Sequence, residues 1–246
     1  KQNKNAIKGL FGRYLEVYIS KTVDVQGVDV EIKNLAKKEK MDVNTHHETN
    51  SQKNIAIFVT KEPLCLKTIL SNAKSLKGKI SVIISTEKTL APLAKKAKIP
   101  FVIVQEKNQQ KSEEKIIGIC KKYEIDLISL ARYMRILSPN FVWRYPNRII
   151  NIHPSLLPAF PGASAYAQAF ERGTKIVGVT SHYVTENLDQ GPIIFQDSFK
   201  VDPNDTLEKM KAKGQKLEAD TLLKAMKMHL ENKLEVRWRK VHIKSK

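Results

Sequence analysis

Residues 149–162 of this 246-residue chain have the sequence I-I-N-I-H-P-S-L-L-P-A-F-P-G, a β-branched run followed by a proline-rich loop. The run ends at His153-Pro154, because proline lacks a backbone N–H and keeps the residue before it extended. We therefore predict a strand over residues 149–152 with polar side chains at its tip. Asn151 and His153 are two residues apart, so they share one face of that strand.

The tip of this strand is a candidate active site, because ligands of open α/β sheets bind at the carboxyl ends of the strands. An amide and an imidazole are suited there to hold a carbonyl oxygen that becomes negative during attack. The two residues alone also fit a plainer explanation, in which Asn151 caps a turn and His153 is a hydrogen-bonded, half-buried ring.

A second stretch, residues 178–192 with the sequence G-V-T-S-H-Y-V-T-E-N-L-D-Q-G-P, favours the active site. A strand that carries His182 continues into a loop, where Asp189 directly precedes a turn signal. If this strand lies beside the first, then Asn151, His153 and Asp189 converge. A carboxylate, an imidazole and an amide in one crevice suffice for attack of a weak nucleophile on a carbonyl. Asp189 by itself would be explained as a turn aspartate.

From residue 55 onward, short β-branched runs alternate with helical segments, which is typical of an α/β protein with a mostly parallel sheet. We expect strands at residues 55–59, 80–84, 101–104, 127–130, 149–152, 177–184 and 192–197. We expect helices at residues 64–73, 89–97, 111–123, 139–145, 166–172 and 206–230.

Residues 1–50 differ from this pattern and predict a separate partial α+β module that ends in a polar linker. A strand at 14–19, a helix at 28–38 and a strand at 41–45 are too few for a core of their own. The catalytic domain would then occupy residues 51–246. The basic start of the chain fits either the end of a transit segment or an exposed leader, so organellar import stays open beside a cytoplasmic location.

The composition excludes several classes of protein. No apolar run is long enough to cross a bilayer, so we expect no membrane partner. Cys65 and Cys120 lie in separate apolar stretches, and His46-His47 has no partner cluster at ligand spacing, so neither a disulfide framework nor a metal site is expected. A reducing compartment fits best.

The net charge of +18 invites a nucleic-acid interpretation, but the kind of charge argues against it. Only 8 of the 43 basic residues are arginine, and the 35 lysines are spread over nearly every predicted helix. Contacts to bases and phosphates favour the arginine fork, whereas lysine fills solvated helix faces. We expect a basic surface that attracts a polyanionic small substrate, and no nucleic-acid partner.

The motif N-I-H-P-S-L-L-P-x-F-x-G followed by S-H-Y-V-x-x-x-L-D-x-G-P-I-I resembles the folate-dependent formyltransferase family, which handles 10-formyltetrahydrofolate. The resemblance covers about residues 54 to 240 and implies a Rossmann-like formyltransferase sheet. It also implies that Asn151, His153 and Asp189 are the catalytic residues. The formyl-folate would be the substrate, and no cofactor is expected.

The resemblance also implies a folate site at the tip of the strand over residues 127–130, where the sequence L-A-R-Y-M-R-I-L matches the folate-binding segment of the family. In relatives the backbone of this segment and the loop after the His182 strand hold the pterin ring. His182 would be a structural partner of the Asp189 loop. The folate-binding candidates are Met134, Arg135, Ile136, Leu137, Val184 and Leu188.

The family contains hydrolases and transferases, and the loop at residues 60–66, T-K-E-P-L-C-L, favours the hydrolases. Transferases that act on glycinamide ribonucleotide cradle its phosphate with a Gly/Ser/Asn-rich loop here. This loop lacks glycine, contains Pro63 and places the Glu62 carboxylate near the expected phosphate. Pro154 and Leu156 favour the opposite assignment, because the hydrolases usually have histidine and phenylalanine at these positions.

The expected reaction is therefore hydrolysis of 10-formyltetrahydrofolate to formate and tetrahydrofolate, which supplies formate for one-carbon and purine metabolism. The alternative is a phosphoribosylglycinamide formyltransferase. A catalytically idle folate sensor or a lysine-rich nucleic-acid binder on the same fold is a third interpretation. The hydrolases also carry an N-terminal ACT-like module, which residues 1–50 resemble in its second half. Such modules bind effectors and form subunit contacts, so a homo-oligomer is expected.

Overall fold

The computed structural model describes residues 5–7, 10–12, 15, 17, 20, 22–43, 45–47 and 52–244. By its internal contacts the chain divides into two units, Lys1–Ser51 and Gln52–Lys246. In the smaller unit, strands β1 (Asn5–Ile7) and β2 (Leu10–Gly12) pair antiparallel. They precede helix α1 (Val25–Lys38), which confirms the predicted helix.

Two predictions for the smaller unit had other outcomes. The strand predicted at residues 14–19 lies largely outside the described residues. The strand predicted at 41–45 is wrong for residues 41–43, which are irregular. Helix α1 ends in a left-handed turn at Lys40, and the amide of Met41 donates to the carbonyl of Ala36 at 2.8 Å. The ACT-like identity of residues 1–50 stays a prediction.

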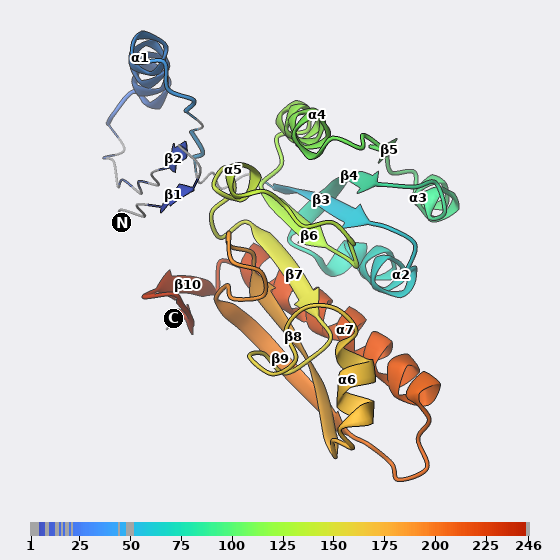
Figure 1. Cartoon of the computed structure of the whole chain (residues 1–246). Helices are drawn as coiled ribbons and strands as arrows, with labels where there is room; N and C mark the ends of the chain where they lie inside the picture. Colours follow the sequence, from blue (N-terminus) through green and yellow to red (C-terminus); the bar gives the residue numbers. More distant parts are fainter. Residues whose placement is uncertain are drawn as a thin grey trace. The chain divides into compact units, whose positions relative to one another are not determined.

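The larger unit contains a seven-stranded sheet in the order β5-β4-β3-β6-β7-β8-β9 (Figure 1). Only β8 runs against its neighbours, so the predicted mostly parallel α/β sheet is confirmed. The strands are β3 (Lys53–Val59), β4 (Gly78–Ser85), β5 (Phe101–Ile103), β6 (Leu127–Leu130), β7 (Ile149–His153), β8 (Ile176–Tyr183) and β9 (Ile193–Lys200). The sheet is built outward from β3 in its middle, first through β4 to β5 on one side and then from β6 to β9 on the other. The strand order therefore reverses between β3 and β6. This is the position where such sheets bind ligands.

Helices cover both faces of the sheet (Figure 1). The helices are α2 (Leu64–Ser71), α3 (Ala91–Lys96), α4 (Gln109–Lys122), α5 (Pro139–Val142), α6 (Ala165–Glu171) and α7 (Leu207–Leu230), with a 3₁₀ turn η1 (Ala73–Ser75). Side chains alternate along β3: Ile55 and Ile57 pack with α2 and α7, whereas Ala56 and Phe58 pack with α4 and α5. Burial on both faces explains why the strands are continuous apolar runs.

Capping side chains set the helix starts. Ser138 Oγ accepts from the amide of Phe141 at 3.2 Å and begins α5, as its Ser-Pro sequence predicts. That helix ends at Val142 rather than at 145, because the chain continues into a turn closed by the amide of Tyr145 on the carbonyl of Val142. Among the described helices, none is long and apolar enough to cross a membrane.

A C-terminal hairpin of β10 (Leu234–Arg237) and β11 (Lys240–Ile243) is absent from the predicted elements. Its two-residue turn places Trp238 and Arg239 at φ of 50° and 62°. Turns of this kind usually carry Asn-Gly or Asp-Gly, and Trp-Arg gives no such signal.

Candidate active site

Pairing of β7 with β8 brings the two polar stretches together, as the predicted convergence requires. Asn151 lies opposite His182, and His153 lies opposite Thr180. Because β8 is antiparallel to β7, its carboxyl end lies beside the amino end of β7, and the loop after Tyr183 must turn back to reach His153. A bond of 2.9 Å from the amide of Tyr183 to the carbonyl of Pro192 closes this loop. Gly191 makes the return possible, because a Cβ there would lie 1.6 Å from the Tyr183 carbonyl oxygen.

The returning loop places the Asp189 carboxylate against His153. Asp189 Oδ2 lies 3.4 Å from His153 Nδ1, and the two side chains are only 6% and 5% exposed. The same oxygen accepts a hydrogen bond of 2.9 Å from the amide of Gly162. Asp189 adopts a left-handed backbone with φ of 55°, which aspartate tolerates better than most residues. The proline-rich loop after β7 and the loop after β8 therefore fix the carboxylate together.

The hydrogen bonds of His153 define where its protons lie. His153 Nε2 is 2.9 Å from the carbonyl oxygen of Phe160, and since a carbonyl only accepts, Nε2 carries a hydrogen. Nδ1 of His153 faces the Asp189 carboxylate, so an imidazole and a carboxylate are placed to pass a proton between them. Such a pair is suited to general acid–base catalysis.

His182 lies between Asn151 and the Asp189 loop and contacts both. Its Nδ1 donates to the carbonyl of Tyr183 at 3.0 Å, which leaves Nε2 as the acceptor in the neutral ring. Nε2 accepts from Asn151 Nδ2 at 3.2 Å and lies 3.8 Å from Asp189 Oδ1. Burial lowers the pKa of His182, so the neutral form is favoured. One amide hydrogen of Asn151 is thereby fixed, and its other hydrogen remains for a ligand.

The predicted folate residues divide into exposed and buried side chains. Met134, Ile136 and Leu188 are 65%, 68% and 53% exposed. Leu137 is buried and Val184 packs against the same core, so these two can contact a ligand mainly through the backbone. Within the described chain, the amides of residues 135, 136 and 137 donate to no protein group. Three free donors beside exposed apolar side chains suit a flat, polar-edged ring.

A buried network beside this loop escaped the sequence analysis. Arg132 lies two residues after the end of β6 at φ of 64°, and its guanidinium is 3.1 Å from Glu218 on α7. Tyr166 donates a 2.7 Å hydrogen bond to the other oxygen of Glu218. Glu218 is fully buried, and burial raises its pKa. The available signal was a glutamate on the apolar face of α7, four residues before the buried Leu222.

A cavity of only about 10 Å³ adjoins this network. It is lined by Glu62, Leu64, Cys65, Arg132, Gln215 and Glu218. The volume holds about one water molecule. The loop at residues 60–66 therefore borders a space of water size.

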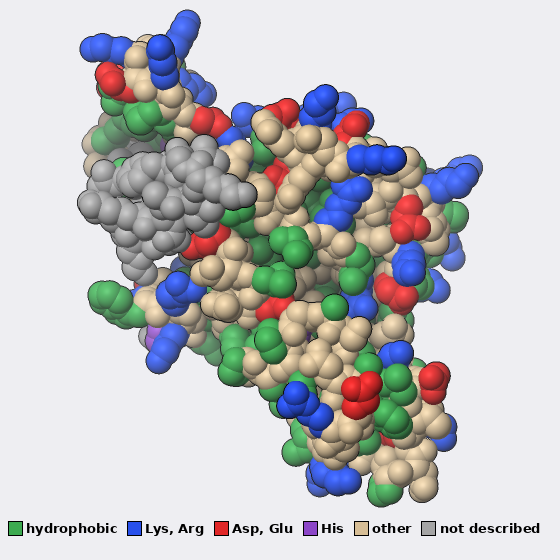
Figure 2. All heavy atoms as spheres, viewed as in Figure 1, with side chains coloured by type: hydrophobic (Ala, Val, Ile, Leu, Met, Phe, Trp, Pro, Cys, Tyr) green, Lys and Arg blue, Asp and Glu red, His purple; other side chains and the backbone are tan. Residues whose placement is uncertain are grey.

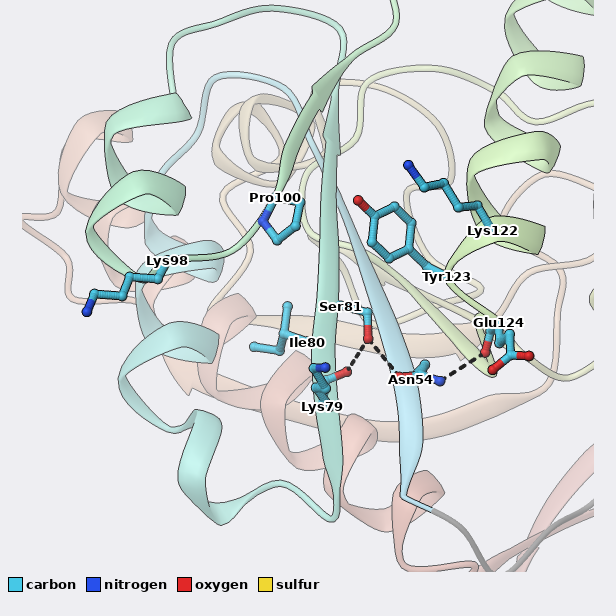
Figure 3. Close-up of a pocket in the computed structure, with 9 residues that line it drawn as sticks. All are labelled: Asn54, Lys79, Ile80, Ser81, Lys98, Pro100, Lys122, Tyr123 and Glu124. Carbon is cyan, nitrogen blue, oxygen red and sulfur yellow. Dashed lines mark hydrogen bonds between the residues drawn. The ribbon is translucent and has the colours of Figure 1, made fainter.

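A larger hollow, of about 390 Å³, lies at the amino ends of the parallel strands and away from the candidate site (Figure 3). Ser81 Oγ donates to Asn54 Oδ1 at 2.8 Å, so the polar groups of its wall satisfy each other. Lys122 lies over the ring of Tyr123, whereas Lys98 points away from that ring (Figure 3). These cations do not converge on one ligand position.

On the visible face of the molecule, Lys and Arg side chains are dispersed among other residues (Figure 2). Cys65 and Cys120 are buried free thiols, and burial raises the pKa of each to about 12. In the part of the chain that the structure describes, no group of three or more His, Cys, Asp or Glu residues is arranged to hold a metal ion.

The chain has relatives among known proteins. Formyltetrahydrofolate deformylase of Bacillus subtilis is 44% identical over 188 residues, which are 75% of this chain and 63% of that protein. The chain thus spans less than two thirds of the length of this relative. A solved formyltetrahydrofolate deformylase from Pseudomonas syringae has a TM-score of 0.77 and 32% identity over 90% of this chain and 76% of its own.

A solved transferase is also similar. Glycinamide ribonucleotide transformylase 1 from Symbiobacterium toebii has a TM-score of 0.76 and 30% identity, covering 81% of this chain and 98% of its own. The family model described as formyl transferase matches residues 53–226, which include β7, the loop with Asp189 and the segment with Met134. From this match and from the geometry of the site, the chain belongs to the formyl transferase family.

Proposed function

We propose that this protein hydrolyses 10-formyltetrahydrofolate to formate and tetrahydrofolate. The observation that carries the proposal is the buried His153–Asp189 pair, whose histidine is on the same strand face as Asn151. The exposed side chains of Met134 and Ile136 and the free backbone amides of residues 135–137 supply a surface for the folate rings. The similarity to deformylases over three quarters of the chain agrees with this reaction.

In the proposed mechanism, a water oxygen attacks the formyl carbon, and the carbonyl oxygen becomes an oxyanion. Asn151 donates its second amide hydrogen to that oxygen, while a positively charged His153 stabilises it through space. Asp189 accepts the proton that the water loses. The bond between the formyl carbon and N10 then breaks, N10 takes a proton from the His153–Asp189 pair, and formate leaves. The balance is one water consumed and one proton released with formate.

Hydrolysis rather than transfer is favoured by the sequence of the loop at residues 60–66. The loop has no glycine and contains Pro63, so it lacks the run of free backbone amides that cradles a ribonucleotide phosphate. The Glu62 carboxylate in the loop would also repel a phosphate. The similarity to a transformylase and the presence of Pro154 and Leu156 keep transfer as the second candidate.

The test is release of formate from 10-formyltetrahydrofolate by the purified chain, with and without glycinamide ribonucleotide. Formate without the nucleotide supports hydrolysis. Formyl transfer that depends on the nucleotide would establish the second candidate and overturn the proposal. Binding of tetrahydrofolate with neither product would instead indicate a folate sensor.

The formate would enter one-carbon metabolism and purine synthesis. A cytoplasmic location, a homo-oligomer and an effector or subunit-contact role for residues 1–50 stay predictions.

A further inference from the structure

We propose that Gln109 and Glu113, at the start of α4, are positioning residues that hold the loop at residues 134–138 in its substrate-binding form. This inference rests on the proposed function, because it concerns the segment that would hold the folate. Neither residue belongs to the motifs that identify the family, and both contact the loop from a different part of the chain.

Glu113 fixes the end of the loop through Ser138. Its Oε1 accepts from the amide of Ser138 at 2.7 Å, and its Oε2 accepts from the Ser138 hydroxyl. The hydroxyl in turn caps α5 by accepting from Phe141. Glu113 is only 6% exposed, and Gln109 and Ser138 contact it as neutral hydrogen-bond donors. A buried carboxylate is retained only where its hydrogen bonds are satisfied, so this contact is specific to the loop position.

Gln109 fixes the middle of the loop. Its Nε2 donates to the carbonyl of Ile136 at 3.0 Å and to Glu113 Oε1 at 3.1 Å, so the two residues act as one clamp. Arg135 adds bonds of 3.2 Å each to the Glu106 carbonyl and the Ser112 hydroxyl. On the opposite side, the amide of Met134 donates to Thr60 Oγ1 at 3.0 Å. The loop is thus tied at both ends and in the middle.

The bonds of this clamp leave the substrate-facing groups free. They use the Ile136 carbonyl and the Ser138 amide, while the amides of residues 135–137 have no protein acceptor in the described chain. Met134 and Ile136 are mostly exposed. Exposing apolar side chains and unpaired amides is unfavourable without a ligand, and a loop free to move would fold them inward. The clamp keeps these groups presented, so the substrate does not have to order the loop.

The decisive variant is Glu113→Gln, with Glu114→Gln as its matched control. Glu114 is the next residue on α4, is exposed, and accepts a similar bond of 3.0 Å from Gln110. If the carbonyl oxygen of a glutamine at 113 keeps the Ser138 amide, its NH2 group faces the Ser138 hydroxyl, which then loses the charged acceptor to which it donates in the wild type. We expect KM for 10-formyltetrahydrofolate and Kd for tetrahydrofolate to rise about tenfold or more, with kcat changed less than about threefold. Glu114→Gln should leave all three within about twofold.

A second pair of variants, at exposed positions, tests the clamp even if the buried Glu113→Gln variant misfolds. Gln109 and Gln110 are both exposed, so Gln109→Leu and Gln110→Leu should both fold. Only Gln109→Leu should raise KM and Kd, by about threefold or more.

Unchanged KM and Kd in both Glu113→Gln and Gln109→Leu would overturn the clamp. A fall in kcat alone, in step with lowered thermal stability, would also overturn it. If the wild-type chain binds tetrahydrofolate without hydrolysing the formyl compound, the proposed function fails while the Kd values still test the clamp. A wild-type chain that binds no tetrahydrofolate would overturn both.

Discussion

The contact between His182 and Asn151 yields a prediction that separates orientation from chemistry. In His182→Asn, the shorter amide can still donate to the Tyr183 carbonyl but cannot reach Asn151. In His182→Gln, the longer side chain places its amide oxygen near the position of Nε2 and can accept from Asn151 Nδ2, which now lies 3.2 Å from that nitrogen. His182→Asn therefore removes the hydrogen bond to Asn151, and His182→Gln removes the one to Tyr183.

The expected change in kcat follows from the free energy of the hydrogen bond between His182 and Asn151. Loss of a neutral hydrogen bond of about 0.5–1.5 kcal/mol frees the amide to rotate, which lowers kcat by about twofold to tenfold. The upper limit is the expected effect of Asn151→Ala, about 10²-fold or more, because that variant removes the proposed oxyanion donor itself. We expect His182→Asn to fall in the first range and His182→Gln to stay within about twofold of the wild type.

The assay is a double-mutant cycle on kcat for formate release at saturating substrate, with tetrahydrofolate binding as a control for folding. If His182 acts through Asn151, then His182→Asn causes no further loss in the Asn151→Ala background, and the coupling equals its single-mutant effect. Fully additive losses would refute the reasoning. So would a His182→Gln variant that is slower than His182→Asn, because the bond to Tyr183 would then be the important one.

Three other substitutions test the site and its surroundings. Asp189→Asn keeps the shape that accepts from Gly162 but cannot take a proton, so turnover should vanish while tetrahydrofolate binding stays nearly intact; lost binding with normal turnover would contradict a catalytic role. Gly214→Ala should lower the free energy of unfolding by about 1–3 kcal/mol in urea titrations, because the new Cβ would lie 2.2 Å from Tyr166 Oη; unchanged stability would contradict this packing. Burial lowers the pKa of the half-buried His229 to about 4, so as the pH falls the unfolded chain protonates His229 before the folded chain does. The stability that neutral His229 contributes is therefore complete above about pH 6.5 and is lost as the pH falls toward 4. Allowing for partial exposure, the loss is about 2 kcal/mol, and His229→Phe should flatten the profile; equal slopes in both proteins would refute the assignment.

The elements that sequence predicts well here are those whose pattern arises from burial. The apolar runs at β3, β4, β6 and β7 are buried on both faces, so each is visible without knowledge of its neighbours. The shared face of Asn151 and His153 follows in the same way from the period of a strand. Both predictions depend only on residues close together in the chain.

Contacts between distant residues were not predictable from such patterns. Arg132 and Glu218 are 86 residues apart, and nothing in either local sequence specifies the partner. The same holds for His182, whose contact with Asn151 depends on the antiparallel register of β7 with β8. The motif places a histidine at this position, but only the register shows which side chain it holds.

The structure also bears on two distant sequence features that gave opposite answers on hydrolysis and transfer. Leu156, which resembles the transferases, packs against Gly178 of β8, where a Cβ would come within 2.6 Å of the leucine side chain. Its identity therefore reflects how the loop after β7 fits the sheet. Glu62, in contrast, belongs to the loop after β3 and lines the small cavity beside Arg132 and Glu218. Because Leu156 is constrained by packing against a strand, it says less about the acceptor than the loop at residues 60–66, which supports the proposed hydrolysis.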